Sequence, residues 1–244
     1  MKKLMRIGVA LFLPIILWGG TGDVILKKAE DAMNASKDRT ATMKLTLIDK
    51  DGDSKVREIK MWQLGKEKRL IKFLSPADVK GVGFLVLSDN EMYLYMPAFK
   101  KIRRIASHVK NESFMGTDFS YNDIGKCQYT KDFTAEIKEE TEEEYALELT
   151  PRPKSDVDYA KLIMCVDKAH YLPSKVEYYN KKGTREKIMK NENIEKIDGY
   201  WTPREVTMKH LKTEHKTVME LVNVVHDTGL EESMFSKRML KRAE

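Results

Sequence analysis

The hydrophobic residues of this chain recur with a helical period in one early segment and with a strand period over most of the remaining sequence. From Asp23 to Ser36, apolar residues stand three or four positions apart, and charged residues lie between them. This spacing predicts an amphipathic helix, whose apolar stripe must be buried against the rest of the protein.

Beyond this helix, apolar and polar residues alternate with a period of two. Met43, Leu45 and Leu47 begin the pattern, and it returns in short segments as far as Val225, separated by turn residues such as those at positions 49–53. Segments of this length and spacing predict an antiparallel meander of about ten or eleven strands. Residues 230–240 fit either a short helix or a further strand.

A meander of this kind has two edges and one apolar face, and it can close as a barrel or roll around the helix. Periodicity by itself predicts only an antiparallel sheet with one amphipathic helix. The side chains expected on the inner face are those of Leu45, Leu47, Ile59, Met61, Ile71, Phe73, Leu147, Leu149, Leu162, Met164, Val176, Tyr178, Val206 and Met208.

The stretch from Phe73 to Tyr121 departs from simple alternation. The run from Phe84 to Leu87 is wholly apolar, and the strand predicted from Met92 to Met96 carries Met, Leu or Tyr on both of its faces. Two apolar faces indicate a core on one side of the sheet and a partner or ligand on the other.

The composition is typical of a soluble globular protein, with 41% hydrophobic and 34% charged residues among 244. The formal net charge of +6 falls to +3 without Lys2, Lys3 and Arg6. This near balance gives no support to nucleic-acid binding, and a mixed, solvated surface is the simpler interpretation.

The first 22 residues have the pattern of a secretory signal peptide. A basic start is followed by an apolar run from Ile7 to Trp18 and then by small residues at 19–22. A membrane anchor is the alternative, but this run is shorter than the roughly 20 residues that span a bilayer. We therefore expect residues 1–22 to be removed and residues 23–244 to form one exported domain.

Residues that could carry chemistry are scattered. The five histidines have no metal-binding spacing, and Gly81-Val82-Gly83 is too short for a phosphate-binding loop. Cys127 and Cys165 could form a disulfide in an exported protein or remain two separate thiols. The sequence favours a protein that is not an enzyme and that needs neither a cofactor nor a metal.

Three blocks of the central stretch resemble the outer-membrane lipoprotein-sorting family, the LolA-like periplasmic carriers. They are the segment with Phe73, Leu74, Pro76, Asp78, Lys80 and Gly81, then Arg103-Arg104-Ile105, then residues 113–121; a weaker match continues through residues 199–203. The resemblance covers nearly all of residues 23–244. It implies a half-open β-barrel wrapped around the N-terminal helix, a periplasmic location and an apolar cavity for acyl chains.

The residues expected to line such a cavity or its rim are large, apolar or amphipathic, and two are arginines. They are Met61, Phe73, Phe84, Tyr93, Tyr95, Arg103, Arg104, Phe114, Met115, Phe119, Tyr121, Met164, Tyr178 and Trp201. Adjacent strand residues point to opposite faces, so one of the two arginines should face the inner side or its rim. The loop from Phe114 to Phe119 fits a cavity wall and a partner contact equally well, and Asp118 could bond to its own loop.

These features lead to a functional expectation. The chain resembles a monomeric periplasmic carrier that takes lipid or lipoprotein acyl chains from an inner-membrane transporter and passes them towards an outer-membrane acceptor. A sensor that binds the same ligands and regulates a membrane partner is the alternative, and an envelope protein with a filled core is a third possibility.

Overall fold

The computed structural model describes residues 21–125 and 128–242. Its helices are α1 (Thr21–Met33), α2 (Tyr121–Gly125), α3 (Tyr129–Asp132) and α4 (Lys237–Lys241), with short 3-10 turns η2 (Pro97–Phe99), η3 (Ser107–Val109) and η4 (Glu232–Met234). Its first strands are β1 (Asp38–Ile48), β2 (Ser54–Leu64), β3 (Lys68–Ser75), β4 (Gly83–Ser88), β5 (Glu91–Met96) and β6 (Lys101–Arg104). The remaining strands are β7 (Phe133–Glu140), β8 (Glu144–Pro151), β9 (Tyr159–Asp167), β10 (Pro173–Asn180), β11 (Arg185–Ile197), β12 (Tyr200–His210) and β13 (Lys216–His226).

Within these described residues, thirteen strands form one antiparallel sheet in the order β6-β5-β4-β3-β2-β1-β13-β12-β11-β10-β9-β8-β7. Pairing of β1 with β13 joins the early and late parts of the chain, while β6 and β7 form the two edges and do not pair with each other. The sheet is therefore a half-open barrel, as predicted. It has more strands than the ten or eleven expected.

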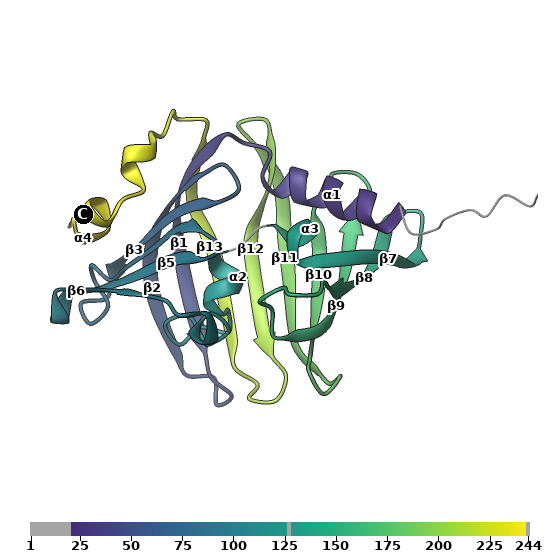
Figure 1. Ribbon diagram of the computed structural model, residues 1–244, viewed down its shortest axis with the longest axis horizontal. Helices are drawn as coiled ribbons and strands as arrows, with labels where there is room; N and C mark the ends of the chain where they lie inside the picture. Colours follow the sequence, from purple (N-terminus) through teal and green to yellow (C-terminus); the bar gives the residue numbers. More distant parts are fainter. Residues whose placement is uncertain (1–20, 126–127, 243–244) are drawn as a thin grey trace, which may run out of the picture.

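The sheet curves around the helices α1, α2 and α3, which lie on its concave face (Figure 1). All fourteen side chains predicted for the inner face belong to the two apolar clusters of that face, most of them buried and Met61 and Val206 partly so. Alternation in β1–β3, β8–β10 and β12 thus identified the concave surface correctly.

Helix α1 begins at Thr21, two residues before the expected domain boundary, and ends at Met33 rather than Ser36. Asn34 ends it by donating its side-chain amide to the Glu30 carbonyl (2.8 Å). The helix also protects the open edge of β7: Asp23 Oδ1 accepts from the Ala135 N–H (2.8 Å), and Gly22 lies where any Cβ would collide with the Ala135 carbonyl. The rest of the predicted signal peptide, residues 1–20, lies outside the described residues.

The C-terminal segment crosses to the convex face and forms η4 and α4 there. Phe235 and Leu240 pack on Trp62, Leu70, Leu85 and Tyr93, the outward residues of β2–β5. The Asp38 carboxylate anchors this segment by accepting hydrogen bonds from Thr228, Gly229 and Leu230. The second apolar face predicted for residues 92–96 is therefore covered largely by the protein's own C-terminus.

Cys165 is a buried free thiol, and Cys127 lies outside the described residues.

No helix in the described part of the chain is long and apolar enough to cross a membrane.

Candidate functional site

The concave face is divided into two apolar halves. The half beneath β1–β6 contains the buried side chains of Leu45, Leu47, Ile59, Ile71, Phe73, Val79, Val82, Phe84, Val86, Met92, Leu94, Ile105, Phe114 and Tyr121. The half beneath β7–β12 contains Phe119, Phe133, Ala135, Leu147, Leu149, Leu162, Met164, Val166, Val176, Tyr178 and Met208, together with Ile25, Leu26 and Ala29 of α1. Ile124 and Met219 contact both halves, so the two halves form one continuous apolar hollow.

The protein's own aromatic side chains occupy the first half. Phe114 is 0% exposed, and its ring centroid lies 5.1 Å from that of Phe84, 5.4 Å from that of Tyr121 and 6.0 Å from that of Phe73. It reaches this place from a tight turn, residues 113–120, in which Met115 and Gly116 both have positive φ. We call these residues the inserted turn.

Polar contacts hold the inserted turn against the sheet. The buried carboxylate of Asp118 accepts hydrogen bonds from Thr217 Oγ1 (2.7 Å), and its Oδ2 lies 2.7 Å from His215 Nδ1. The Asp118 N–H donates to Thr217 Oγ1 (3.0 Å), and Lys187 Nζ donates to the Asp118 carbonyl (2.9 Å). Arg57 adds a bond to the Met115 carbonyl.

These contacts correct one expectation. The Asp118 side chain bonds to Thr217 of β13 and to the partly buried His215, rather than to its own loop. The sequence contained one indication of this contact. Asp118 stands among apolar residues, and a buried carboxylate needs a partner. Its partners stand nearly a hundred positions away, so local pattern could not name them.

Helix α1 fills the second half in a similar way. Its buried Glu30 accepts hydrogen bonds from Thr130 N (2.9 Å) and Thr130 Oγ1 (2.7 Å) and lies 3.3 Å from Lys66 Nζ. Since a buried charge is costly unless it is hydrogen-bonded and paired, these contacts fix the helix to α3 and to the β2–β3 turn.

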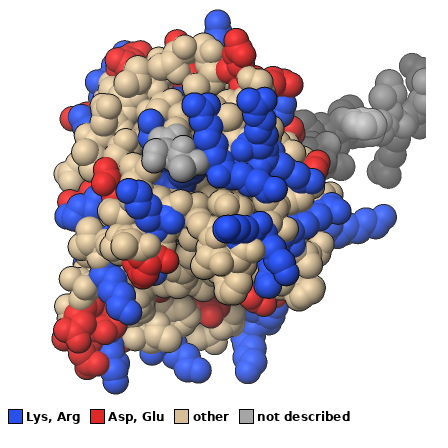
Figure 2. All heavy atoms as spheres, turned by 90° about the vertical axis from the view of Figure 1, so that its left-hand side faces the viewer, with Lys and Arg blue, Asp and Glu red and all other residues tan. Residues whose placement is uncertain are grey.

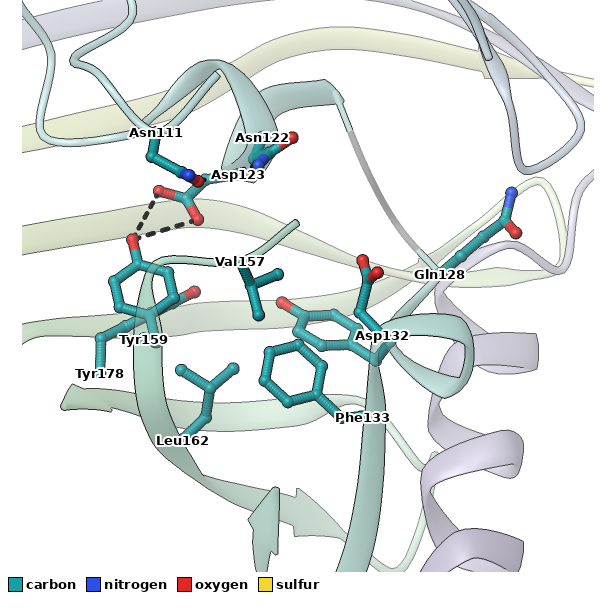
Figure 3. Close-up of a pocket in the computed structure, with 11 residues that line it drawn as sticks. Asn111, Asn122, Asp123, Gln128, Asp132, Phe133, Val157, Tyr159, Leu162 and Tyr178 are labelled. Atoms are coloured by element: carbon teal, nitrogen blue, oxygen red, sulfur yellow. Dashed lines mark hydrogen bonds between the residues drawn. The ribbon is translucent and has the colours of Figure 1, made fainter. Parts of the chain in front are cut away.

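Beside the second half lies a small, partly polar seam (Figure 3). Its cavity of about 50 Å³ is lined by Asn111, Asn122, Asp123, Gln128, Tyr129, Asp132, Phe133, Val157, Tyr159, Leu162 and Tyr178. Tyr159 Oη donates to the Asp123 carboxylate (3.3 Å). Burial, followed by the Asp123 charge, raises the pKa of Tyr159 well above its ordinary value, so the phenol stays protonated and donates.

The seam is far smaller than the roughly 300–1,000 Å³ of a typical small-molecule pocket. The empty apolar hollow that the family resemblance implies is therefore not present among the described residues, because Phe114 and α1 fill the space.

Apart from the two arginines, the predicted site residues fall into three groups. Met61, Phe73, Phe84, Phe114, Met115, Phe119, Tyr121, Met164 and Tyr178 meet in the concave hollow. Tyr93 and Tyr95 face outwards against the C-terminal segment, because β5 alternates and Leu94 takes the inner position. Trp201 is 45% exposed, with its ring 5.5 Å from that of His170.

Register assigns the two arginines to opposite faces. Arg103 pairs with Leu94 and so lies on the concave side at the rim, whereas Arg104 pairs with Tyr93 on the convex side. Both are exposed, and Arg104 Nη2 donates to the Asn90 carbonyl (2.8 Å).

The buried cation Arg69, on the concave face, was not among the residues predicted from the sequence. Arg69 donates to the Ile124 carbonyl (2.6 Å) and to Gln63 Oε1 (3.1 Å), which ties α2 to the sheet. No group of three or more His, Cys, Asp or Glu side chains suited to a metal ion occurs in residues 21–125 and 128–242.

Comparisons with known proteins agree with this architecture. A family model described only as "Uncharacterized protein" matches residues 65–242, and no curated protein matches the chain. An outer membrane lipoprotein-sorting protein domain from Vibrio parahaemolyticus is 31% identical, with a TM-score of 0.85, over 92% of this chain and 100% of that one. A DUF1329 family protein from Desulfovibrio piger is 27% identical, with a TM-score of 0.82, over 89% of this chain and 98% of that one.

A LolA superfamily protein from Nitrosomonas europaea shares the fold, with a TM-score of 0.76 and 22% identity over 90% of this chain and 99% of that one. The similarity to the Vibrio domain extends beyond fold to sequence and covers that domain completely. This chain therefore belongs to the outer membrane lipoprotein-sorting protein family.

Proposed function

We propose that this protein is a periplasmic carrier that binds acyl chains of lipid or lipoprotein in the concave hollow. It takes them from an inner-membrane transporter and delivers them towards an outer-membrane acceptor. Family membership supports a role in lipoprotein sorting. The observation that carries the proposal is Phe114, a fully buried side chain delivered into the hollow by a short turn rather than by the sheet itself.

An acyl chain can take the place of such a side chain. When the inserted turn withdraws, Phe73, Phe84 and Tyr121 lose an aromatic neighbour, and an acyl chain of similar cross-section restores apolar contact with them. The hollow then stays filled in both states, which avoids the cost of an empty apolar cavity.

The free energies lost and gained in this exchange are of the same order. Exposing one Phe side chain costs roughly 1.5–3 kcal/mol, and each hydrogen bond of the inserted turn contributes about 0.5–1.5 kcal/mol. About ten buried methylenes contribute roughly 8 kcal/mol in return. The cargo is therefore held weakly enough for an acceptor that offers a comparable apolar surface to take it onward.

Two measurements test this function. Solvent extraction of the purified protein followed by mass spectrometry should recover bound lipid, and the protein should move labelled lipid between donor and acceptor vesicles. Bound lipid without transfer would favour the sensor. A protein that carries no lipid and moves none would contradict the carrier and favour an envelope protein with a permanently filled core.

A further inference from the structure

A concentrated basic surface lies at the end of the molecule that carries β6 and α4. It combines the turn after β3, the β5–β6 hairpin and the C-terminal helix, and Figure 2 shows Lys and Arg side chains crowding this side. We define the basic face as Lys80, Lys100, Lys101, Arg103, Arg104, Lys237, Arg238, Lys241 and Arg242, all of them exposed.

These cations are not neutralised by their surroundings. Within the described residues, no ion pair joins any of the nine to a carboxylate. The opposite half of the sheet differs, because Glu148 holds Lys138 and Lys161, and Glu177 holds Lys175 and Arg185. The positive charge of a nearly balanced chain is therefore concentrated at one end.

The contributing segments meet in space. A pocket of about 240 Å³ has Lys80, Pro97, Lys241 and Arg242 among its lining residues. Lys72 lies buried at this pocket and donates to the Arg242 carbonyl, which fixes the end of α4 to β3. Lys237 Nζ stands 4.1 Å from the ring centroid of Tyr93 and holds the start of α4 to β5.

An aromatic side chain protrudes from the same end. Phe99, in the η2 turn between β5 and β6, is 59% exposed and is followed directly by Lys100 and Lys101. An apolar ring held in water beside cations matches the boundary between lipid headgroups and acyl chains, where aromatic residues concentrate.

We infer that the basic face docks this protein onto the surface of an anionic phospholipid bilayer, with Phe99 entering the headgroup layer. The nine exposed cations lie on three separate segments, so a protein partner would need carboxylates at matching positions. The phosphates of a fluid lipid layer can instead pair with the cations in any arrangement. Each Lys or Arg near such a surface strengthens binding several-fold. Docking uses the convex face and the edge of the sheet at β6 rather than the interior of the concave hollow.

Vesicle co-sedimentation of the purified chain tests this inference without any cargo. Wild type should bind phosphatidylcholine vesicles containing about one-third phosphatidylglycerol, bind pure phosphatidylcholine vesicles weakly, and be released near 1 M salt, where the screening length falls to about 3 Å. Lys101→Glu with Lys241→Glu should weaken binding at least about tenfold.

The matched control is Lys182→Glu with Lys212→Glu, two exposed hairpin lysines outside the basic face that give the same change of net charge. It should bind as wild type does, and all chains carry the same N-terminus, so any contribution from the apolar residues 7–18 cancels. Phe99→Ala should bind about fivefold more weakly, since part of a Phe burial is lost.

Equal binding to charged and uncharged vesicles would overturn the inference, as would a basic-face variant that behaves like the control. Failure of the wild type to bind anionic vesicles would also overturn it, and would leave the basic face to an acidic protein. A Phe99→Ala chain that binds at full strength would remove the aromatic anchor.

Discussion

At the scale of single residues, Phe114 shows how the hollow is closed. Its ring touches aromatic side chains from β3, β4 and α2, yet it belongs to none of these elements. A residue so placed contributes as much to the closed form as a core residue, while leaving the sheet intact if it moves.

Phe114→Ala should therefore lower the free energy of unfolding by about 3–5 kcal/mol, because it leaves an apolar cavity. A medium-chain fatty acid should restore part of this loss by filling the cavity. Thermal unfolding with and without fatty acid measures both effects, and the exposed Trp201→Ala serves as the control with little change in either. A variant that is destabilised but not rescued would argue against an acyl-binding hollow.

His226 makes stability depend on pH. Burial, together with the Arg39 charge, lowers its pKa below the ordinary value, and nearby Asp198, Asp227 and Asp38 oppose this only in part. The unfolded chain then binds a proton more readily than the folded one, so His226 stabilises the fold above about pH 6.5 and less as pH falls towards its folded-state pKa.

Urea unfolding between about pH 7.5 and about pH 5 tests the sign of this effect. Wild type should lose more stability on acidification than His226→Gln, whose amide does not titrate. Parallel profiles for the two proteins would exclude His226 as a source of the pH dependence.

At the scale of elements, two of the hydrogen bonds that hold the inserted turn share one hydroxyl group, that of Thr217. Thr217 Oγ1 donates to the Asp118 carboxylate and accepts from the Asp118 N–H. Thr217→Val keeps the volume and removes both bonds, so the closed position of the turn should lose about 1–3 kcal/mol.

Acyl binding should then tighten about tenfold, because less free energy is spent in displacing the turn. Titration with a fluorescent fatty acid gives the affinity, and Thr184→Val in an exposed hairpin is the matched control. An affinity that stays equal to wild type or becomes weaker would mean that the turn does not move to admit the chain.

The C-terminal segment depends on one carboxylate in the same way. Burial opposes the charge of Asp38, but hydrogen bonds from Thr228, Leu230 and Gly229 outweigh it and lower its pKa. Asp38 therefore stabilises the fold above its unfolded-state pKa, and this contribution is lost as pH falls through the lower folded-state value.

Asp38→Ala should release this segment and speed amide hydrogen exchange in α4, while β11 and β12 keep their protection. Asp51→Ala, in the exposed β1–β2 hairpin, is the control. Unchanged exchange in α4 would show that packing on Trp62 and Leu85 holds the segment without Asp38.

At the scale of the whole molecule, alternation was enough to predict an antiparallel sheet and its inner face, whereas the half-open barrel followed from the family resemblance. Leu45, Ile71 and Met164 stand at positions that a period of two assigns correctly. Arg103 and Arg104 were expected on opposite faces of a strand, but which of them faces inward could not be predicted, because β6 is a largely exposed edge strand without an apolar face.

The closure of the hollow could not be predicted from the sequence. It depends on contacts between residues far apart, such as Asp118 with His215, and on which of several aromatic residues turns inward. Tyr93 and Tyr95 illustrate the limit, because both faces of β5 are apolar and alternation could not show that Leu94 takes the inner position.

The most direct test of an acyl-binding hollow is photo-cross-linking with a fatty acid that carries a diazirine at the end of its chain, followed by peptide mapping. The carrier account predicts labels on concave residues of β3, β4, β9 and β10 and on the inserted turn, and their loss when unlabelled fatty acid competes. Labels confined to the convex face around α4, or none that unlabelled fatty acid removes, would contradict it.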